Sequence, residues 1–473
     1  MKTSFDSTWL EWIATNIARN CNIDEMNDIL LANDFCPELI QSHLRVHSTD
    51  LFAINQNLAE KTLPPSTQPN ILAKPNNTVG KNVYLANADK IDTRGKLELF
   101  NIDNFLNAQE CVDLLSLIRG SLRESTITNK SGTLKNYRTS KTCDLSLLNH
   151  PLVNDIDQRI CKALGFNSSY SEPIQAQWYN KHQEFKPHTD YFEPNSEEFD
   201  THAKLNGQRT WTFMIYLNNT LAGGATEFTR LNKAFLPKRG RAVIWNSLTA
   251  QGNENIESMH CGSPVEDGFK VIITKWFRLK GSGKRFTKEP NEYLPCYTDE
   301  GFFKTTLPEQ LFKKITDFYH EFATKTLNQE NTISIRQENK PLSNTSMPLT
   351  ENLTQEIQQT VQPLVEAWFG HYLKLTQLSG IKSYFNGTVI APRRQESHKS
   401  VVCVVINVLQ VESQPWPLII DDHNYRSHQL LLKPGDMVFY ESAKLKHGRP
   451  DAFNGAQYAN IYLDYHLPPA EEG

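Results

Sequence analysis

Two short pairs of a histidine and an acidic residue have the residue types and spacing to bind a metal ion. His182 precedes Glu184 by two positions, and His188 precedes Asp190 in the same way. Residues i and i+2 of a β-strand point to the same face, so either pair could offer an imidazole and a carboxylate to one ion. A chain of 473 residues with 14 histidines and 53 acidic residues contains roughly 1.6 such pairs by chance. Spacing alone therefore selects neither pair.

A metal site for oxygen chemistry needs one more ligand than such a pair supplies. Two imidazoles and one carboxylate on one side of Fe(II) leave coordination positions open, which is the arrangement of non-haem oxygenases. The second histidine would have to come from a distant strand. Taken alone, His188 is more simply a histidine at a surface or at the mouth of a barrel, and Lys270 is a surface lysine.

The elements that would position these residues begin as alternating helices and strands and then become short strands. β-Branched and aromatic runs between turn residues predict strands at 97–102, 174–179, 210–217, 241–245 and 270–277. Apolar residues at helical spacing predict helices at 107–122 and 155–164. Helices followed by many short strands indicate an α+β arrangement, or a barrel with helical support.

The same pattern returns later in the chain. Helices expected at 305–325 and 353–369 precede a second strand-rich block at 380–466, which predicts two related barrels in tandem. Before the first barrel, residues 1–46 carry tryptophans and aliphatic residues at helical spacing, and we expect a small helical module for packing or docking. Residues 47–92 are rich in proline and asparagine, as is typical of a linker.

Composition narrows the class of protein. Hydrophobic residues make up 39% of the chain and charged residues 22%, with a formal net charge of -4. We expect no nucleic-acid partner, because no dense stripe of lysine and arginine occurs. We expect no membrane span, because no run of roughly 18 apolar residues occurs. The eight cysteines lack C-x-x-C or zinc-type spacing and the N-terminus makes a poor signal peptide, which favours reduced thiols and a cytoplasmic protein.

Five longer stretches follow one another along the chain, and the first of them contains both histidine–acid pairs. They read IQAQWYNKHQEFKPHTDYF (174–192), RTWTFMIYLNN (209–219), GGATEF (223–228), LPKRGRAVIWN (236–246) and MHCGSPVEDGFKVIITKWFR (259–278). In this order and spacing they resemble the prolyl 4-hydroxylase-like branch of the 2-oxoglutarate dioxygenases. RTSKTCDL (138–145) resembles the segment beside the substrate groove of that family. The resemblance covers about residues 95–281 and implies a double-stranded β-helix, or jelly roll.

The resemblance separates the two histidine–acid pairs. His188 and Asp190 match the first two iron ligands of the family, and His260 matches the third. His182 and Glu184 fall in the preceding loop, where we expect them to be exposed to solvent.

The resemblance also implies where 2-oxoglutarate binds. Lys270 matches the residue that holds the side carboxylate of this co-substrate, and Tyr179, Thr274 and Trp276 match positions in the pocket wall. A lysine that points inward from an apolar strand needs an anionic partner, which 2-oxoglutarate would supply. Phe185 stands where many relatives carry tyrosine, so the substrate pocket need not match theirs.

A second and less specific resemblance covers residues 305–466, to the C-terminal segment of tandem hydroxylase-like proteins. It rests on VVINV (404–408), PWPLIIDDH (415–423), LKPGDMVFYESAKLKHGRP (432–450) and YANIYLDYH (458–466). Where relatives carry His-x-Asp, this chain has Arg393, Arg394 and Gln395, although His447 keeps the distal-ligand position. A guanidinium offers a metal no lone pair, so we expect this domain to bind no iron and to have a structural or substrate-positioning role. We expect Asp421-Asp422-His423 to be a turn at a strand end.

Together, these expectations describe a protein of the α+β fold class. A helical module (1–46) and a linker (47–92) precede a jelly-roll catalytic domain with supporting helices (93–285), and a second similar barrel follows (300–469). The resemblance implies a dioxygenase that uses Fe(II), 2-oxoglutarate, O2 and ascorbate to hydroxylate a peptide or protein, with proline as the leading target. The same chemistry on another residue or a small molecule stays open, as do a non-catalytic binding scaffold and the oligomeric state.

Overall fold

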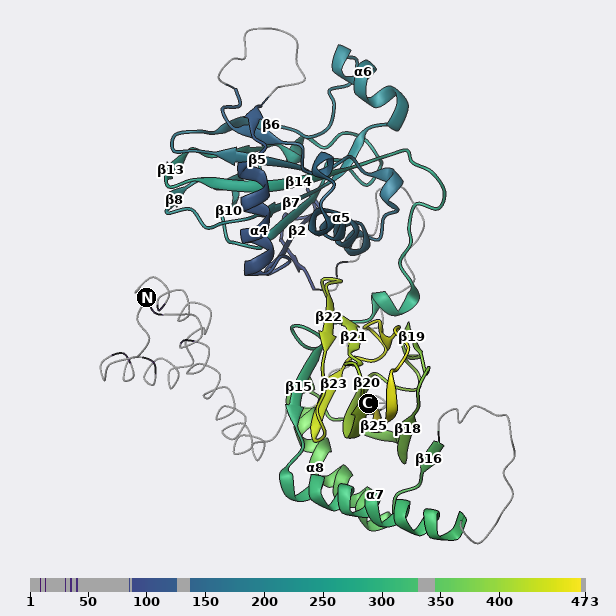
Figure 1. Ribbon diagram of the computed structural model, residues 1–473. Helices are drawn as coiled ribbons and strands as arrows, with labels where there is room; N and C mark the ends of the chain where they lie inside the picture. The colour runs from purple at the N-terminus through teal and green to yellow at the C-terminus, as the bar shows by residue number, and fades with distance from the viewer. Residues whose placement is uncertain are drawn as a thin grey trace.

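Two folded units make up the described part of the chain, shown as a computed structural model in Figure 1. The described residues are 87–125, 137–330 and 345–468, together with Trp9, Ile13, Leu30, Phe35, Ile40 and Leu85. Apart from these single residues, the helical module expected at 1–46 and most of the linker expected at 47–92 lie outside the described residues. In the described part, no helix is both long and apolar enough to cross a membrane, and the six described cysteines are free thiols.

The first unit is built on two β-sheets (Figure 1). The larger sheet contains, in spatial order, β1 (Asp89–Lys90), β2 (Leu99–Ile102), β11 (Ala242–Asn246), β7 (Arg209–Tyr216), β14 (Lys270–Arg278), β5 (Gln175–Tyr179), β4 (Lys141–Cys143) and β3 (Arg123–Glu124). The smaller sheet contains β10 (Lys233–Phe235), β9 (Thr226–Phe228), β12 (His260–Gly262) and β6 (Phe185–His188), and beside it β8 (Ala222–Gly223) pairs with β13 (Val265–Asp267). Tyr179 and Trp245 of the larger sheet share a core with Phe228 and Phe235 of the smaller one, so the two sheets face each other.

Helices cover the other face of the larger sheet. These helices are α4 (Ala108–Arg119) and α5 (Pro151–Leu164). The chain also forms α6 (Glu197–Asn206) and 3-10 helices at Leu145–Leu148, Ser168–Tyr170, Ile256–Ser258 and Pro290–Tyr293. Asn107 and Glu110 begin α4 with a capping box, and Gly165 ends α5 with a φ of 74° that favours glycine. Ile118 of α4 and Ile160 of α5 belong to one apolar core with the sheet. The expected α+β class and jelly roll are confirmed for this unit.

The second unit, which follows residue 301, also contains two sheets. The larger one contains β15 (Phe302–Thr306), β23 (Asp436–Tyr440), β20 (Val402–Glu412), β25 (Gly455–His466), β18 (Ile381–Tyr384) and β16 (Thr345–Met347), with β17 (Lys374–Leu378) also paired to β25. The smaller one contains β19 (Ile390–Arg393), β24 (His447–Arg449), β21 (Leu418–Asp421) and β22 (Ser427–Leu430). Two helices, α7 (Glu309–Glu330) and α8 (Glu351–Phe369), pack Ile315 and Ile357 into the core of this unit.

The strand order of the first unit is repeated in the second. β2-β11-β7-β14-β5-β4 corresponds to β15-β23-β20-β25-β18-β16, and β10-β9-β12-β6 corresponds to β22-β21-β24-β19. The repeat allows positions in the two units to be compared strand by strand. In this comparison, the strands that carry His188 and His260 in the first unit correspond to β19 and β24 in the second.

A partly buried ion-pair network joins the two units. Arg159 of α5 donates from Nη1 to Glu110 Oε1 over 2.5 Å and from Nη2 to the Phe105 carbonyl over 2.6 Å. Arg426, next to β22, donates from Nη2 to Glu110 Oε2 over 3.1 Å and to the Phe105 carbonyl over 3.0 Å. Arg426 also forms an ion pair of 2.8 Å with Asp422. Charge-assisted hydrogen bonds of this kind fix the orientation of the groups that they join.

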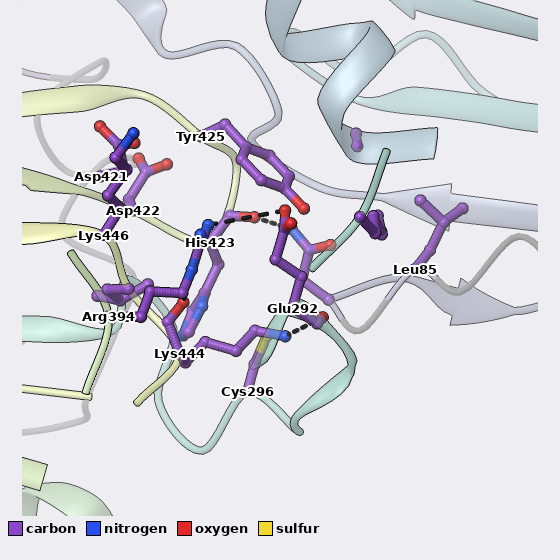
Figure 2. Close-up of a pocket in the computed structure, with 14 residues that line it drawn as sticks. Leu85, Glu292, Cys296, Arg394, Asp421, Asp422, His423, Tyr425, Lys444 and Lys446 are labelled. Atoms are coloured by element: carbon purple, nitrogen blue, oxygen red, sulfur yellow. Dashed lines mark hydrogen bonds and ion pairs between the residues drawn. The ribbon is translucent and has the colours of Figure 1, made fainter. Parts of the chain in front are cut away.

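A small cavity of about 30 Å³ lies at the junction of the units (Figure 2). It has room for about one water molecule. His423 in its wall is buried, and its Nε2 lies 3.2 Å from Glu441 Oε1. The expected turn is present here, since Asp421 ends β21 and Tyr425 N donates to the Asp422 carbonyl over 2.9 Å.

We expect Arg426→Met to weaken the junction of the units. The substitution leaves the Glu110 carboxylate with Arg159 as its remaining arginine partner, and a hydrogen bond to a charged group contributes about 1.5–3 kcal/mol. Hydrogen exchange of the Phe105–Glu110 backbone should become faster. The midpoint temperature of the first thermal unfolding transition should fall. Arg123→Met, which removes a more exposed ion pair with Asp144, is the matched control. Equal effects of the two substitutions would contradict a stabilising role for Arg426.

Candidate active site

One cavity of about 50 Å³ lies between the two sheets of the first unit. All seven residues assigned from the sequence line it: His188, Asp190, His260, Tyr179, Lys270, Thr274 and Trp276. They come from β5, β6, β12, β14 and the residues just after β6, so strands that are distant in the sequence bring them together. His182, of the other histidine–acid pair, is exposed in the preceding loop.

The three proposed metal ligands form a cluster. His188 and His260 are paired positions of the antiparallel strands β6 and β12, and their ring centroids are 4.3 Å apart. One ligand atom from each of His188, Asp190 and His260 lies within 4.8 Å of the other two. Within the described ranges, no other group of three histidine, cysteine or acidic residues meets this criterion. The donor set of two imidazoles and one carboxylate fits Fe(II).

The expectation that His188 and Asp190 share a strand needs correction. β6 ends at His188, and Asp190 lies two residues beyond it in a bend. Asp190 is held instead by β7, where the Thr212 hydroxyl donates to Asp190 Oδ2 over 2.6 Å. The carboxylate thus reaches the cluster through a turn and a hydrogen bond, and the alternation of a strand does not place it there.

Hydrogen bonds to the backbone orient both imidazoles. His188 Nδ1 lies 2.8 Å from the Lys186 carbonyl, and His260 Nδ1 lies 2.9 Å from the Ser258 carbonyl. An Nδ1–H that donates to a carbonyl leaves Nε2 as the nitrogen with a free lone pair, which is what a metal requires. Burial, together with the nearby His260, lowers the pKa of His188 to about 3, so this imidazole is neutral at physiological pH.

The carboxylate of the cluster is charged despite its burial. Burial alone would raise the pKa of Asp190, but His260, His188 and Arg209 and the hydrogen bond from Thr212 together lower it below its usual value. Imidazoles bind a metal ion through a lone pair as neutral ligands, so with the carboxylate of Asp190 the ligand set would carry one negative charge, which suits a divalent cation.

We expect Thr212→Val to weaken metal binding by about tenfold, since loss of an outer hydrogen-bonding partner of a ligand costs roughly 10–100-fold in affinity or activity. Valine keeps the shape of threonine and removes the hydroxyl that holds Asp190. Titration of the apoprotein with Fe(II) under nitrogen would measure the change. The neighbouring Thr210, whose hydroxyl donates to the Phe277 carbonyl, gives the control Thr210→Val. Unchanged Fe(II) affinity in Thr212→Val would contradict a positioning role for Thr212.

Lys270 is a buried cation without a carboxylate partner among the described residues. Its side chain is 1% exposed, its Nζ donates to the Gly224 carbonyl over 2.9 Å, and it lies 4.5 Å from the centre of the Tyr179 ring. Burial lowers its pKa to about 8. Gly262 leaves room for it, because a Cβ there would come within 3.1 Å of Nζ. A buried ammonium of this kind fits an anion that enters from solution.

Two buried donors beside Lys270 support the same conclusion. Gln177 Nε2 and Trp276 Nε1 have no hydrogen-bond partner in the described structure, and Thr274 donates to the amide oxygen of Gln177 over 3.1 Å. Unpaired buried donors are costly unless a ligand satisfies them. Gln177 was not assigned from the sequence, although it lies two residues before Tyr179 on β5 and so points to the same face.

The second unit places different residues at the corresponding position. His447 of β24 pairs with Arg393 of β19, as His260 pairs with His188 in the first unit. Gln395 follows two residues after Arg393, where an acid follows His188.

Comparisons with known proteins agree with this geometry. The sequence model of the 2OG-Fe(II) oxygenase superfamily matches residues 174–278. A putative prolyl 4-hydroxylase of Acanthamoeba polyphaga mimivirus is 33% identical over 180 residues, which cover 38% of this chain and 73% of that protein. The prolyl 4-hydroxylase subunit alpha-1 of Bos taurus is 32% identical over 201 residues, which cover 42% of this chain and 37% of that subunit.

Among solved structures, the viral collagen prolyl hydroxylase of Paramecium Bursaria Chlorella virus-1, determined with 2OG, is 23% identical, with a TM-score of 0.31. The match covers 38% of this chain and 95% of that one. The chain thus spans most of the mimivirus protein and little more than a third of the bovine subunit. On the sequence matches and the residues of the pocket, the chain belongs to the 2OG-Fe(II) oxygenase superfamily, in its prolyl 4-hydroxylase-like branch.

Proposed function

We propose that the first unit is an Fe(II)- and 2-oxoglutarate-dependent dioxygenase that hydroxylates a prolyl residue of a peptide or protein. The observation that carries the proposal is the cluster of His188, Asp190 and His260 in one pocket with the buried ammonium of Lys270. Similarity to proteins named as prolyl 4-hydroxylases supports proline as the target residue.

The metal ion and the side chains of the pocket would have separate roles in this reaction. Fe(II), with 2-oxoglutarate and O2, supplies the oxidation of a C–H bond, with succinate and carbon dioxide as co-products. Lys270 donates to the side carboxylate of 2-oxoglutarate, and Gln177 and Trp276 offer their buried donors in the same pocket. Trp245 and Phe228, whose ring centres lie 4.7 and 5.7 Å from that of His260, exclude water on that side.

The substrate would approach past the mouth of this pocket. Arg138 lines the cavity and lies 4.9 Å from the centre of the Phe185 ring. Tyr137 is next to it, and its hydroxyl donates to the Pro187 carbonyl just before His188. These residues belong to, or directly precede, the segment that resembles the edge of a substrate groove, and they would position the peptide beside the metal.

The affinity for 2-oxoglutarate should depend on pH through Lys270. The ammonium form binds the dianion, and burial lowers the pKa of the free protein's Lys270 to about 8. Raising the pH through 8 therefore removes the proton that binding needs, and the dissociation constant should rise about tenfold for each further pH unit. Titration with 2-oxoglutarate between pH 7 and pH 10 would check this. A constant value across this range would show that Lys270 does not carry the interaction.

We propose for the second unit, 300–469, that it is a related jelly roll that binds no iron. The repeated strand order supports the relation. Arg393 and Gln395 at the places of a histidine and an acid argue against a metal site. The first unit would extend over 93–285 as the catalytic domain, although β1 at Asp89–Lys90 already pairs with β2. We also propose that ascorbate keeps the iron reduced and that the protein is cytoplasmic.

The test is succinate formation with proline-containing peptides, followed by mass spectrometry of the peptide. The proposal predicts Fe(II)-dependent succinate and one added oxygen on a prolyl residue. Oxygen on another residue, or turnover with a small molecule only, would replace the substrate and keep the chemistry. No Fe(II)-dependent turnover with any peptide of a broad library would favour a binding scaffold.

A further inference from the structure

The second unit contains a cavity at the place that the active site takes in the first. It measures about 120 Å³, and β18, β19, β24 and β25 contribute to its wall. Tyr440 and His447 line it with ring centres 4.6 Å apart, as Trp245 and His260 do at 4.7 Å in the first unit.

Strand register extends this correspondence to the anion-binding end. In the first unit Lys270 of β14 pairs with Tyr179 of β5. In the second, Tyr458 of β25 pairs with Tyr384 of β18. The lysine has therefore been replaced by a tyrosine, and the cation now comes from β24, where Arg449 follows His447 by two residues.

Arg449 is a fixed cation in this cavity. It is buried, its Nη1 donates to the Trp416 carbonyl, and its Nη2 donates to the Tyr458 hydroxyl over 3.1 Å. Its guanidinium carbon lies 4.7 Å from the centre of the Trp416 ring and 4.6 Å from that of Tyr458. These contacts hold the charge in place before any ligand arrives, which lowers the entropic cost of binding.

Two further cations line the same cavity. They are Lys382 and Arg393, and the charges of both act on Asp464 in the same wall without an ion pair within 4.0 Å in the described part of the chain. Lys382 Nζ lies 5.3 Å from the centre of the Tyr462 ring. Asp464 is the acidic residue in the wall, and it accepts a hydrogen bond from Gln395 over 3.4 Å. Three cations against one carboxylate leave a positive excess that favours an anion.

The rest of the lining indicates the kind of anion. Ile390, Val405 and Leu418 contribute apolar side chains, which suit a carbon skeleton better than a bare inorganic ion. The cavity is accessible, because a wider hollow of about 490 Å³ adjoins it and shares Lys382 and Arg393 in its wall.

We propose that this cavity is a metal-independent binding site for a small organic carboxylate. Arg449 and Arg393 would bind the carboxylate, Lys382 would add charge at the mouth, and the apolar wall would contact the carbon skeleton. The second unit would then be a ligand-binding domain joined to the dioxygenase unit through the Arg159–Glu110–Arg426 network, a role separate from the reaction of the first unit.

The experiment uses the full chain with Lys270→Met, treated with EDTA so that the first pocket takes up little of the probe. Calorimetric titration with succinate should give saturable binding, and succinate should raise the melting temperature. Arg393→Gln and Lys382→Gln, each added to this background, should weaken binding by about tenfold or more, as expected for loss of a charged partner. Lys374→Gln, an exposed lysine of β17 outside the cavity, is the matched control.

Three results would overturn the proposal. One is the absence of both heat and thermal stabilisation at millimolar succinate. Another is binding that Arg393→Gln and Lys382→Gln leave unchanged. The third is equal affinity for inorganic phosphate, which would show a general anion site without selection for an organic carboxylate.

Discussion

His260→Ala should reduce Fe(II)-dependent succinate formation by more than about a hundredfold, since loss of an outer partner of a ligand alone costs roughly 10–100-fold. His260 supplies the one ligand of the cluster that comes from β12, paired directly with His188 of β6. Alanine leaves one imidazole and one carboxylate, which hold a divalent iron ion weakly. Fe(II) titration of the apoprotein and a succinate assay at saturating 2-oxoglutarate would measure the two consequences separately.

The chain provides a matched control for this substitution. His182 belongs to the other histidine–acid pair, is exposed, and has a φ of 65° that asparagine tolerates. His182→Asn should leave iron binding and turnover unchanged. A His260→Ala protein with full Fe(II) affinity, or a loss of equal size in His182→Asn, would rule out the proposed ligand set.

Lys270→Met should raise the dissociation constant for 2-oxoglutarate roughly a hundredfold, because a buried hydrogen bond to a charged group contributes about 1.5–3 kcal/mol and each 1.4 kcal/mol is a factor of ten. The folded protein should not be destabilised. Burial already disfavours the ammonium, as its lowered pKa of about 8 shows, and methionine fills the space without a charge. Titration with 2-oxoglutarate in the presence of Mn(II), under nitrogen, would measure affinity apart from turnover.

A second buried lysine on the same strand gives a sharp contrast. Lys275 lies on the other face of β14, where its Nζ is 2.6 Å from Asp157 Oδ1. Lys275→Met should lower the free energy of unfolding by about 2–3 kcal/mol, since it leaves a partly buried carboxylate unpaired, and it should leave 2-oxoglutarate affinity unchanged. If Lys270→Met destabilises the fold instead and binds 2-oxoglutarate normally, Lys270 is a structural residue.

The strands of the first unit could be predicted because their residues alternate or run as apolar segments between turns. The ligand set could be predicted from motifs in a fixed order, although alternation on a strand was the wrong reason for Asp190. That carboxylate lies beyond the end of β6, and its position depends on a hydrogen bond from Thr212, which is 22 residues away. A contact of this kind leaves no local pattern in the sequence.

The sequence also could not predict the role of Gln177 or the network between the units, because both depend on contacts that form only in the folded chain. Gln177 becomes a binding-site candidate when its amide nitrogen is seen to be buried and unpaired in the pocket beside Lys270. The network between the units joins Arg426 to Glu110, which are 316 positions apart. No pattern in the sequence links Arg426 with the helix-capping Glu110, because the two side chains meet only when the two units pack together.

In the second unit, strand pairing shows where Arg393 lies relative to His447. The resemblance to tandem hydroxylase-like proteins predicted that Arg393 stands at the place of an iron ligand. The pairing of Arg393 with His447 places it opposite the remaining histidine, and the cations around it support the proposal of an anion site there.

Crystals grown under nitrogen with Fe(II) and 2-oxoglutarate, and measured at the iron absorption edge, would test the assignment most directly. We predict one anomalous peak, enclosed by His188, Asp190 and His260, with the co-substrate reaching from it to Lys270. A peak beside His447, or an iron ion bound away from these three side chains, would contradict it.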